Sequence, residues 1–359
     1  MRRTAVLLAV AAISAAATLA ADERKPRPKL PPDVEQVFGM AMAAPPEFAA
    51  SALLRLVPRV PEKELRRDLI DMAFHLAAKA QAPVKLLPVP GTEVDTRSGS
   101  LAAAFRLNMD ALSLQARAIR DMIAVDPARA REQWEVLRGT YEAAGHRVET
   151  VAPAAGLPDM VFAANSALVI DGTALLARFR HPQRRGEERE YEEWFAANGF
   201  RVRRSRHVHE GEGDFALDGD VILAASGFRT DRAAHREVAR VFAREVVSLE
   251  LVDPCFYHLD TALFVLAPGR IAYFPGAFSD ESRAVLARRY PDAIIADERD
   301  AAAFGCNAAS DGTRVYLPAG ADHLAERVRA HGFDVVPLDL SELRKAGGSV
   351  KCCTLELRH

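Results

Sequence analysis

The chain has 359 residues, and its 47 Lys and Arg residues against 49 Asp and Glu leave a net charge of −2. This balance argues against a nucleic-acid-binding protein, which normally carries a clustered excess of basic residues. With 49% hydrophobic and 27% charged residues, the composition is that of a globular protein with a sizeable core, and the length favours two domains. Four cysteines are too few for a disulfide scaffold, and no Cys-x-x-Cys zinc spacing is present.

The first twenty residues have the pattern of a secretory signal peptide. A basic start, Met1 to Arg3, precedes an apolar run from Ala5 to Ala21 that ends in small residues. The alternative is a membrane anchor, but about 17 apolar residues, most of them alanine, are short and weakly hydrophobic for a bilayer core of ~30 Å. We therefore expect an exported protein, periplasmic or secreted, whose mature chain has no membrane span.

Two further segments precede the region that carries the chemistry. Residues 21–46 are rich in Pro, Lys and Ala and are expected to form a tether. Residues 47–125 keep apolar residues at helical spacing between charges, and they contain no catalytic motif. We expect a helical module of unknown function there, followed by a catalytic domain over residues 126–359.

From about residue 126 onward the sequence repeats a unit of two short strands, a helix and a third strand. Dipeptides that end in glycine separate the paired β-like runs, because glycine accepts the positive φ that a tight turn needs. The four turns are Asp171-Gly172, Asp218-Gly219, Pro268-Gly269 and Asp311-Gly312. The amphipathic helices that follow them are expected near 187–197, 231–243, 279–289 and 321–330.

The spacing of these units indicates a ring. Hairpins that start near residues 161, 214, 260, 304 and 350 are 53, 46, 44 and 46 residues apart, as in proteins whose units surround an axis. The last unit keeps one strand, 350–357, so a helix over 127–144 and a strand over 147–151 would complete it from the other end. We therefore predict a closed α/β ring of five units that hides its sheet edges.

Reactive side chains fall near the first strand of each unit. They are Asp159 and Asn165, then Glu210 to Asp214, then His258 and Asp260, then Asn307, and finally Cys352. Equivalent positions in a ring face a common centre, so these residues are expected to form one site. A thiol, an imidazole and several carboxylates suit nucleophilic attack on a cationic carbon.

The motifs around these residues resemble the guanidino-modifying superfamily of arginine deiminases, dimethylarginine dimethylaminohydrolases and amidinotransferases, most of all its bacterial dimethylargininase-like and citrulline-utilisation hydrolase branch. In chain order they are Pro158-Asp159-Met160-Val161-Phe162-Ala163-Ala164-Asn165, Arg178 with Arg184-Arg185-Gly186-Glu187, Gly227-Phe228-Arg229-Thr230, His258-Leu259-Asp260-Thr261 and Gly347-Gly348-Ser349-Val350-Lys351-Cys352. The resemblance covers about residues 126–357 and implies a five-bladed α/β propeller, or pentein. It also implies hydrolysis of a C–N bond in a guanidino or ureido amino acid, with neither a metal nor an organic cofactor.

By this resemblance Cys352 is the nucleophile, and His258 is the general acid and base. Glu210 orients the substrate and the histidine, although Glu212 in the same Glu-Gly-x-Gly-Asp segment is an alternative. The implied substrate-binding residues are Asp159, Asn165, Arg178, Arg229, Asp260 and Asn307. Asp260 would clamp the guanidinium through paired hydrogen bonds, and the two arginines would hold the amino-acid end.

Two departures from the family pattern change these expectations. Asn165 stands where dimethylargininases and deiminases carry an acidic residue, so a guanidinium-clamping charge is missing. Weaker cation binding, or a substrate other than arginine, is therefore plausible. The usual opening strand is absent before Asp126, so either Leu101–Asn108 supplies it or the ring is imperfect there.

Other interpretations stay open. An amidinotransferase would pass the same covalent intermediate to an amine acceptor, and a propeller without activity would be a binding module. His207 and His209 could present two metal ligands on one strand face, but no third ligand is evident and no metal is predicted. Cys353 is expected to be a bystander, although a disulfide with Cys352 in an oxidising compartment would make activity depend on reductant.

Overall fold

The computed structural model describes residues 5–9, 53, 56 and 125–358. The predicted tether, nearly all of the predicted helical module and Leu101–Asn108 lie outside the described residues. The chain divides into two compact units, and the unit that contains Asp126–Arg344 holds all the described sheets. Among the described residues, no helix combines the length and the apolar character needed to cross a membrane.

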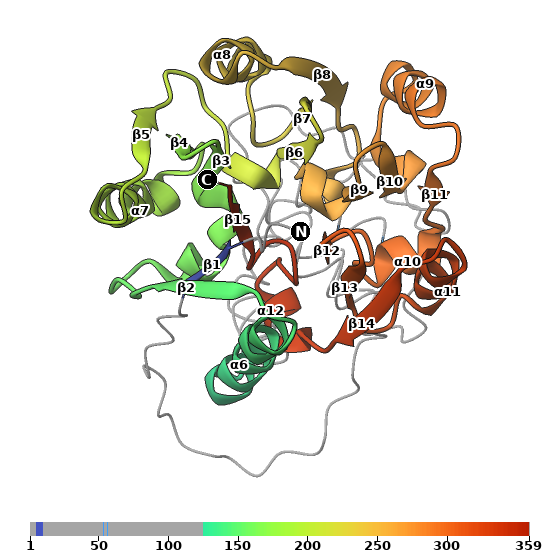
Figure 1. The fold of residues 1–359 in the computed structure, drawn as a ribbon, viewed down its shortest axis with the longest axis horizontal. Helices are drawn as coiled ribbons and strands as arrows, with labels where there is room; N and C mark the ends of the chain where they lie inside the picture. Colours follow the sequence, from blue (N-terminus) through green and yellow to red (C-terminus); the bar gives the residue numbers. More distant parts are fainter. Residues whose placement is uncertain (1–4, 10–52, 54–55, 57–124, 359) are drawn as a thin grey trace, which may run out of the picture. The chain divides into compact units, whose positions relative to one another are not determined.

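Five separate three-stranded sheets surround a common centre in this α/β unit (Figure 1). In each sheet the middle strand pairs antiparallel with the inner strand and parallel with the outer one. Four sheets follow chain order: β3 (Ala167–Ile170), β4 (Thr173–Leu176) and β5 (Arg201–Arg204); β6 (Phe215–Asp218), β7 (Val221–Ser226) and β8 (Glu245–Glu250); β9 (Leu263–Ala267), β10 (Arg270–Tyr273) and β11 (Ile294–Ile295); β12 (Ala309–Ser310), β13 (Arg314–Pro318) and β14 (Asp334–Leu338). Each of these four is one repeat unit of the sequence.

The turns between inner and middle strands lie where the glycine dipeptides predicted them. Gly172 and Gly269, for example, have φ values of 68° and 75°, in the left-handed region that residues with a Cβ avoid. The four predicted hairpins are therefore confirmed.

The helices lie on the outside of the ring (Figure 1). Those that connect middle to outer strands agree with the predicted ranges: α7 (Arg185–Ala197), α8 (Arg232–Phe242), α9 (Asp280–Arg289) and α11 (Asp322–Ala330). The predicted helix near 127–144 is α6 (Pro127–Ala143), which begins where the Asp126 carboxylate accepts hydrogen bonds from two backbone N–H groups. Two five-residue helices, α10 (Glu298–Ala302) and α12 (Ser341–Lys345), were not predicted because they are too short for a periodic signal.

The fifth sheet joins distant parts of the chain, as the closure argument predicted, but its middle strand is not the expected one. It consists of β15 (Leu355–Leu357), β1 (Ala5–Ala9) and β2 (Arg147–Val151). β1 pairs antiparallel with β15 and parallel with β2, the pattern of the other four sheets. The strand in that place comes from the apolar run interpreted as a signal peptide.

The predicted strand over 350–357 is also shorter than expected. Residues 350–353 form a turn, and only Leu355–Leu357 is extended. Cys352 therefore lies in a turn before the inner strand of its sheet.

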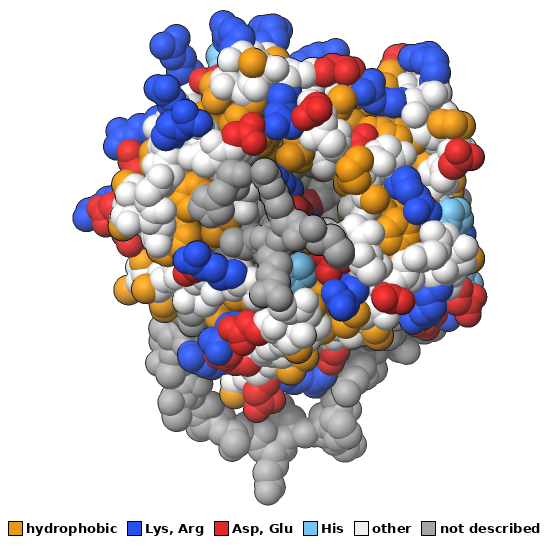
Figure 2. All heavy atoms as spheres, in the orientation of Figure 1, with side chains coloured by type: hydrophobic (Ala, Val, Ile, Leu, Met, Phe, Trp, Pro, Cys, Tyr) orange, Lys and Arg blue, Asp and Glu red, His pale blue; other side chains and the backbone are white. Residues whose placement is uncertain are grey.

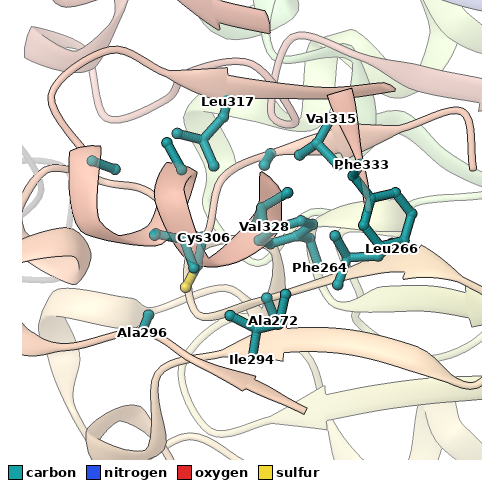
Figure 3. Close-up of a cluster of buried hydrophobic side chains, with 14 residues drawn as sticks. Phe264, Leu266, Ala272, Ile294, Ala296, Cys306, Val315, Leu317, Val328 and Phe333 are labelled. Atoms are coloured by element: carbon teal, nitrogen blue, oxygen red, sulfur yellow. The ribbon is translucent and has the colours of Figure 1, made fainter. Parts of the chain in front are cut away.

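Apolar side chains fill the space between neighbouring sheets and their helices. In Figure 3, Phe264 and Leu266 of β9 lie beside Val315 and Leu317 of β13, with Phe333 at the edge of the cluster. Cys306 is fully buried in the same cluster, where it acts as a small apolar residue. Packing of this kind holds adjacent sheets together and so places the ends of their inner strands.

Two histidines contact Phe215 in another part of the core. The rings of His209 and His235 lie edge-on to Phe215, with centroid distances of 5.2 and 6.2 Å. Burial lowers the pKa of each histidine to about 4, from an ordinary value of 6.5. Both side chains are therefore neutral in the folded protein at pH values where the unfolded chain begins to bind protons.

These depressed pKa values predict a loss of stability in acid. Between pH 6.5 and pH 4 the unfolded state binds protons that the folded state does not, so the free energy of unfolding falls as the pH falls. At pH 5 the loss is about 2 kcal/mol for each histidine. Urea unfolding of wild type and His235→Gln at pH 7 and pH 5 measures it. The stability gap between the two proteins should shrink by that amount at pH 5, and a gap that does not change with pH would contradict the prediction.

Candidate active site

Six of the nine predicted site residues, all except Asp159, Arg178 and Arg229, lie in or next to short turns before the inner strands. Three of these are 3-10 turns: Ala163–Ser166 precedes β3, Gly211–Gly213 precedes β6 and Leu259–Thr261 precedes β9. Asn307 and the turn 350–353 precede β12 and β15 in the same way. Because the inner strands surround the centre of the ring, the turns carry their side chains towards one another. Figure 2 shows this face of the molecule, with acidic and basic side chains interspersed around the ring.

His258 and Glu210 form the first pair in the site. His258 Nε2 lies 2.8 Å from Glu210 Oε2, and Arg229 Nη1 donates to the same oxygen at 3.1 Å. Glu210 is fully buried. Burial alone would raise its pKa, but Arg229 and the hydrogen bond with His258 outweigh it and hold the pKa well below its usual range. Glu210 is therefore an ionised carboxylate that orients the His258 ring.

The turn that carries Glu210 depends on close backbone packing. Gly211 has φ of 53°, and a Cβ there would lie 2.6–2.7 Å from backbone atoms of Ala164 and Ala167. The N–H of Glu210 donates to Thr230 Oγ1 at 3.3 Å. Only glycine allows this approach, which explains why a Glu-Gly step stands here.

The two candidate glutamates have different partners. Glu212 lies in the 3-10 turn that follows Glu210. Its carboxylate, however, binds Lys351 Nζ at 2.6 Å and also Arg358. It makes no contact with His258 among the described residues. The geometry therefore favours Glu210 as the partner of the histidine.

Cys352 is held by an aspartate and an asparagine. Its Sγ donates to Asp260 Oδ2 at 3.2 Å and accepts from Asn307 Nδ2 at 3.1 Å. Asn307 Oδ1 accepts in turn from the backbone N–H of Cys352 at 3.2 Å, so one amide holds both the backbone and the thiol of Cys352. Cys352 and Cys353 are both buried free thiols in the structure.

Burial controls the charge states of this group. Burial, and then the charge of Asp260, raise the pKa of the Cys352 thiol well above its usual range. Burial also raises the pKa of Asp260 to about 7. Asp260 Oδ1 is buried and has no hydrogen-bond partner among the described residues. A bound cation would relieve these penalties, because it would stabilise both the carboxylate and the thiolate.

Asn165 is oriented by an arginine whose role sequence analysis did not identify. Arg184 Nη1 donates to Asn165 Oδ1 at 2.7 Å, and Arg184 is itself paired with the buried Glu187 at 2.8 Å. The Nδ2 of Asn165 is buried without a partner among the described residues, and a Cβ added to Gly213 would collide with it. The same Cβ would lie 3.4 Å from the His258 ring, so the Asn165 amide group and the imidazole share one wall of the site.

The remaining predicted residues lie at the periphery of the site or have other partners. Asp159 is 44% exposed, and its Oδ2 lies 4.0 Å from Arg184 Nε. Arg178 is exposed and donates to the carbonyl of Arg206 at 2.7 Å. Arg229 is buried over the Tyr257 ring, 4.6 Å from its centroid, and binds Glu210. The roles of Arg178 and Arg229 at the amino-acid end of a substrate stay predictions.

Sequence analysis gave no role to two other residues of the site. Asp214 lies 3.9 Å from His258 Nε2 and accepts from Thr230 Oγ1 at 2.7 Å, and burial raises its pKa to about 7. His181 has a buried Nε2 without a partner among the described residues, and burial followed by the charge of Arg229 lowers its pKa. Asp214 ends the Glu-Gly-x-Gly-Asp segment and could have been assigned from it. His181 has no comparable sequence signal.

His207 and His209, the pair considered as metal ligands, belong to no metal-like cluster among the described residues. His209 Nδ1 accepts from the N–H of Gly211 at 3.1 Å and is thereby occupied. In the described part of the chain, Asp297, Asp300 and His323 form the one cluster with metal-like spacing, and Arg327 already donates to Asp300 there at 2.5 Å.

A cavity of about 210 Å³ extends along inner strands β6 and β9. Asp260, Glu212 and Lys351 lie in its wall, whereas Cys352 and His258 do not. The cavity therefore reaches Asp260 but not Cys352.

Known proteins are similar to this chain in sequence and fold. A family model described as N,N dimethylarginine dimethylhydrolase, eukaryotic, matches residues 108–359. The N(G),N(G)-dimethylarginine dimethylaminohydrolase of Mycobacterium tuberculosis is 46% identical over 287 residues, 79% of this chain and 92% of that protein. The bifunctional arginine dihydrolase/ornithine cyclodeaminase ArgZ of Synechocystis is 40% identical over 235 residues, 64% of this chain but 33% of that protein.

Solved structures agree with these matches. The N-terminal domain of ArgZ bound to substrate superimposes with a TM-score of 0.64 at 38% identity, covering 66% of this chain and 89% of that one. A dimethylarginine dimethylaminohydrolase adduct with S-methyl-L-thiocitrulline has a TM-score of 0.58 at 22% identity over 65% of this chain and 90% of that one, which supports the fold alone. The chain belongs to the dimethylarginine dimethylaminohydrolase family of the guanidino-modifying superfamily, and it is a hydrolase that acts on a C–N bond of a guanidino group.

Proposed function

We propose that the protein hydrolyses the guanidino group of an arginine-like amino acid, arginine or a methylated arginine, through a covalent intermediate on Cys352. The observation that carries the proposal is the contact of Cys352 Sγ with Asp260 and Asn307. Asp260 is two residues along the chain from His258, which binds the ionised Glu210. Nucleophile, general acid and base, and carboxylate clamp thus meet at one centre.

The first half of the reaction forms the intermediate. The guanidinium donates to the free Oδ1 of Asp260, and its charge favours transfer of the Cys352 proton to His258. The thiolate then attacks the central carbon of the guanidinium, forming an S–C bond. The bond from that carbon to the leaving nitrogen breaks, and His258 delivers a proton to that nitrogen. The departing group is ammonia or an alkylamine, and a thiouronium remains on the protein.

The second half releases the product. His258, now neutral, takes a proton from a water molecule that attacks the thiouronium carbon. The S–C bond then breaks, the ureido product leaves, and the proton returns from His258 to Cys352 Sγ. Glu210 stabilises the protonated imidazole in both halves, because its own pKa is held well below its usual range.

Replacement of the nucleophile tests the proposal. For Cys352→Ser, release of ammonia or alkylamine from arginine and N-methylated arginines should fall about 10³-fold or more, since a serine hydroxyl is not ionised at neutral pH. Cys353→Ser is the matched control, because Cys353 is an adjacent buried free thiol, and it should stay within a few-fold of wild type. Equal rates for wild type and Cys352→Ser would refute the covalent assignment, and glycine-dependent product formation would identify an amidinotransferase.

Asn165 favours a second hydrolysis at the same carbon. A carboxylate at this position would hold a cationic guanidinium better than a neutral ureido group, whereas the free Nδ2 of Asn165 can donate to a ureido oxygen. A retained ureido product plus one water yields an amine, carbon dioxide and ammonia. The relative ArgZ bears the name arginine dihydrolase, which agrees with this candidate.

Ammonia stoichiometry tests that candidate. Wild type should release about two ammonia molecules per arginine consumed, and Asn165→Asp should release about one because the carboxylate favours the cation over the neutral intermediate product. Enzymatic ammonia assay with amino-acid analysis for citrulline and ornithine gives both numbers. If wild type releases one ammonia per arginine and citrulline is the end product, the protein catalyses only the first hydrolysis and this candidate is refuted.

We also infer that the five sheets are the blades of a five-bladed α/β propeller. Their common strand pattern and their arrangement around one centre support this description. We also propose that residues 47–125 form a helical module. The proposed ligand of the protein is a small guanidino or ureido amino acid.

Export by residues 1–20 is a further part of the proposal, supported by the basic and apolar pattern of that segment. Cleavage after this segment would remove β1, so a cleaved protein would keep β15 and β2 without their middle strand. Mass spectrometry of the chain recovered from the periplasm or medium of the producing cell should find an N-terminus near Asp22. An intact chain that begins at Met1 and stays in the cytoplasm would refute export.

A further inference from the structure

Glu212 is a buried carboxylate that the proposed reaction does not use. It is 2% exposed. Its Oε2 accepts from Lys351 Nζ at 2.6 Å and from the N–H of Glu356 at 3.2 Å, and its Oε1 accepts from Arg358. A carboxylate that is bound at both oxygens in this way has no freedom to turn towards His258.

Glu212 belongs to a cluster of four buried or half-buried charges, which we call the axial cluster: Glu212, Lys351, Glu356 and Arg358. Glu356 binds Lys351 Nζ at 3.1 Å and Arg358 Nη2 at 2.6 Å, so each anion contacts each cation. The cluster has no net charge. Loss of one member would leave its partners with an uncompensated charge in a poorly hydrated place.

The axial cluster connects the two turns on which the proposed reaction depends. Glu212 lies in the 3-10 turn Gly211–Gly213, directly after Glu210, the partner of His258. Lys351 directly precedes Cys352, and its backbone N–H donates to the carbonyl of Asn307 at 3.2 Å. The ion pair between Glu212 and Lys351 therefore spans 139 residues of sequence and ties the nucleophile turn to the histidine–glutamate side of the site.

We propose that Glu212 and Lys351 are positioning residues, which hold the Cys352 turn against the Glu210 turn and balance the charge beside Asp260. This inference rests on the proposed role of Cys352 as the nucleophile. Neither residue touches the reacting atoms; both act through Cys352, Asp260 and Glu210.

The charges of this ion pair act in opposite directions on the thiol and its partner. Burial raises the pKa of Asp260, Lys351 lowers it, and Glu212 raises it. Because Sγ of Cys352 is hydrogen-bonded to Asp260, the two groups titrate as a pair. Removing the cation should therefore raise the apparent pKa of Cys352 alkylation, and removing the anion should lower it.

The test is the pH dependence of Cys352 alkylation by iodoacetamide, followed by peptide mass spectrometry. Lys351→Met should shift the profile to higher pH, and Glu212→Gln to lower pH, each by about half a pH unit or more. The double variant Glu212→Gln/Lys351→Met should return towards wild type, because it restores neutrality. Arg204→Met, which breaks an exposed ion pair with Glu192, is the matched control and should leave the profile unchanged.

The direction of the shifts distinguishes positioning from damage. A merely structural role would lower stability in both single variants and would shift the two profiles in the same direction or not at all. Either result would overturn the inference. Alkylation needs no substrate, so this outcome is independent of whether Cys352→Ser abolishes turnover, which tests the proposed function itself. In turnover, both single variants should lose about 10- to 100-fold in kcat with a smaller change in KM, as expected for a misplaced reacting group.

Discussion

Glu210 has no solvent-exposed surface, and a carboxylate in such a place is stable only when cations and hydrogen-bond donors surround it. Arg229 supplies the cation from the segment between β7 and α8, and His258 supplies a hydrogen bond from the turn before β9. The same demand recurs around the centre, where Glu187 is paired with Arg184 and Glu212 with Lys351. Arg184 and Glu187 are neighbours in the chain, whereas Lys351 and Glu212 are 139 residues apart. Satisfying the charges of the second pair therefore also fixes the positions of two distant turns.

Asp260 differs from these carboxylates. Among the described residues it forms no ion pair within contact distance, one of its oxygens has no partner, and burial raises its pKa to about 7. Its other oxygen accepts from Cys352 Sγ. A guanidinium placed there would supply the missing cation and would favour the thiolate in the same step. In the proposed reaction, substrate binding and activation of Cys352 are therefore one electrostatic event, so a thiol with a raised pKa can still serve as the nucleophile.

The architecture brings these groups together by repetition. In each unit the reactive residue lies in a turn just before the inner strand, and the five inner strands surround one centre. Apolar packing between neighbouring sheets, as around Cys306 and Phe264, then holds the turns at fixed separations. Asn165 occupies one of these equivalent positions, and Arg184 orients its neutral amide. In the proposed second hydrolysis this amide holds the ureido product.

Local sequence was sufficient for much of the fold. The glycine turn dipeptides, the amphipathic helices and the spacing of the units predicted four of the five sheets, because each depends on residues within one unit. It also led to Cys352, His258, Asp260 and Asn307 as candidate site residues, because their residue types suit the proposed chemistry and their motifs resemble a known family.

The choice of partners depended on tertiary structure. Three contacts in the site were not evident from the sequence. Glu210 rather than Glu212 binds His258, Arg229 binds Glu210, and Arg184 orients Asn165. Each contact joins residues from different turns or segments of the fold. The direction of a side chain in an irregular turn has no period that a sequence reveals. The middle strand of the fifth sheet is a similar case, because its pairing with β15 and β2 joins segments more than a hundred residues apart. Hydrogen-bonding edges left open by those strands, and not any local pattern in Ala5–Ala9, decide where that segment lies in this structure.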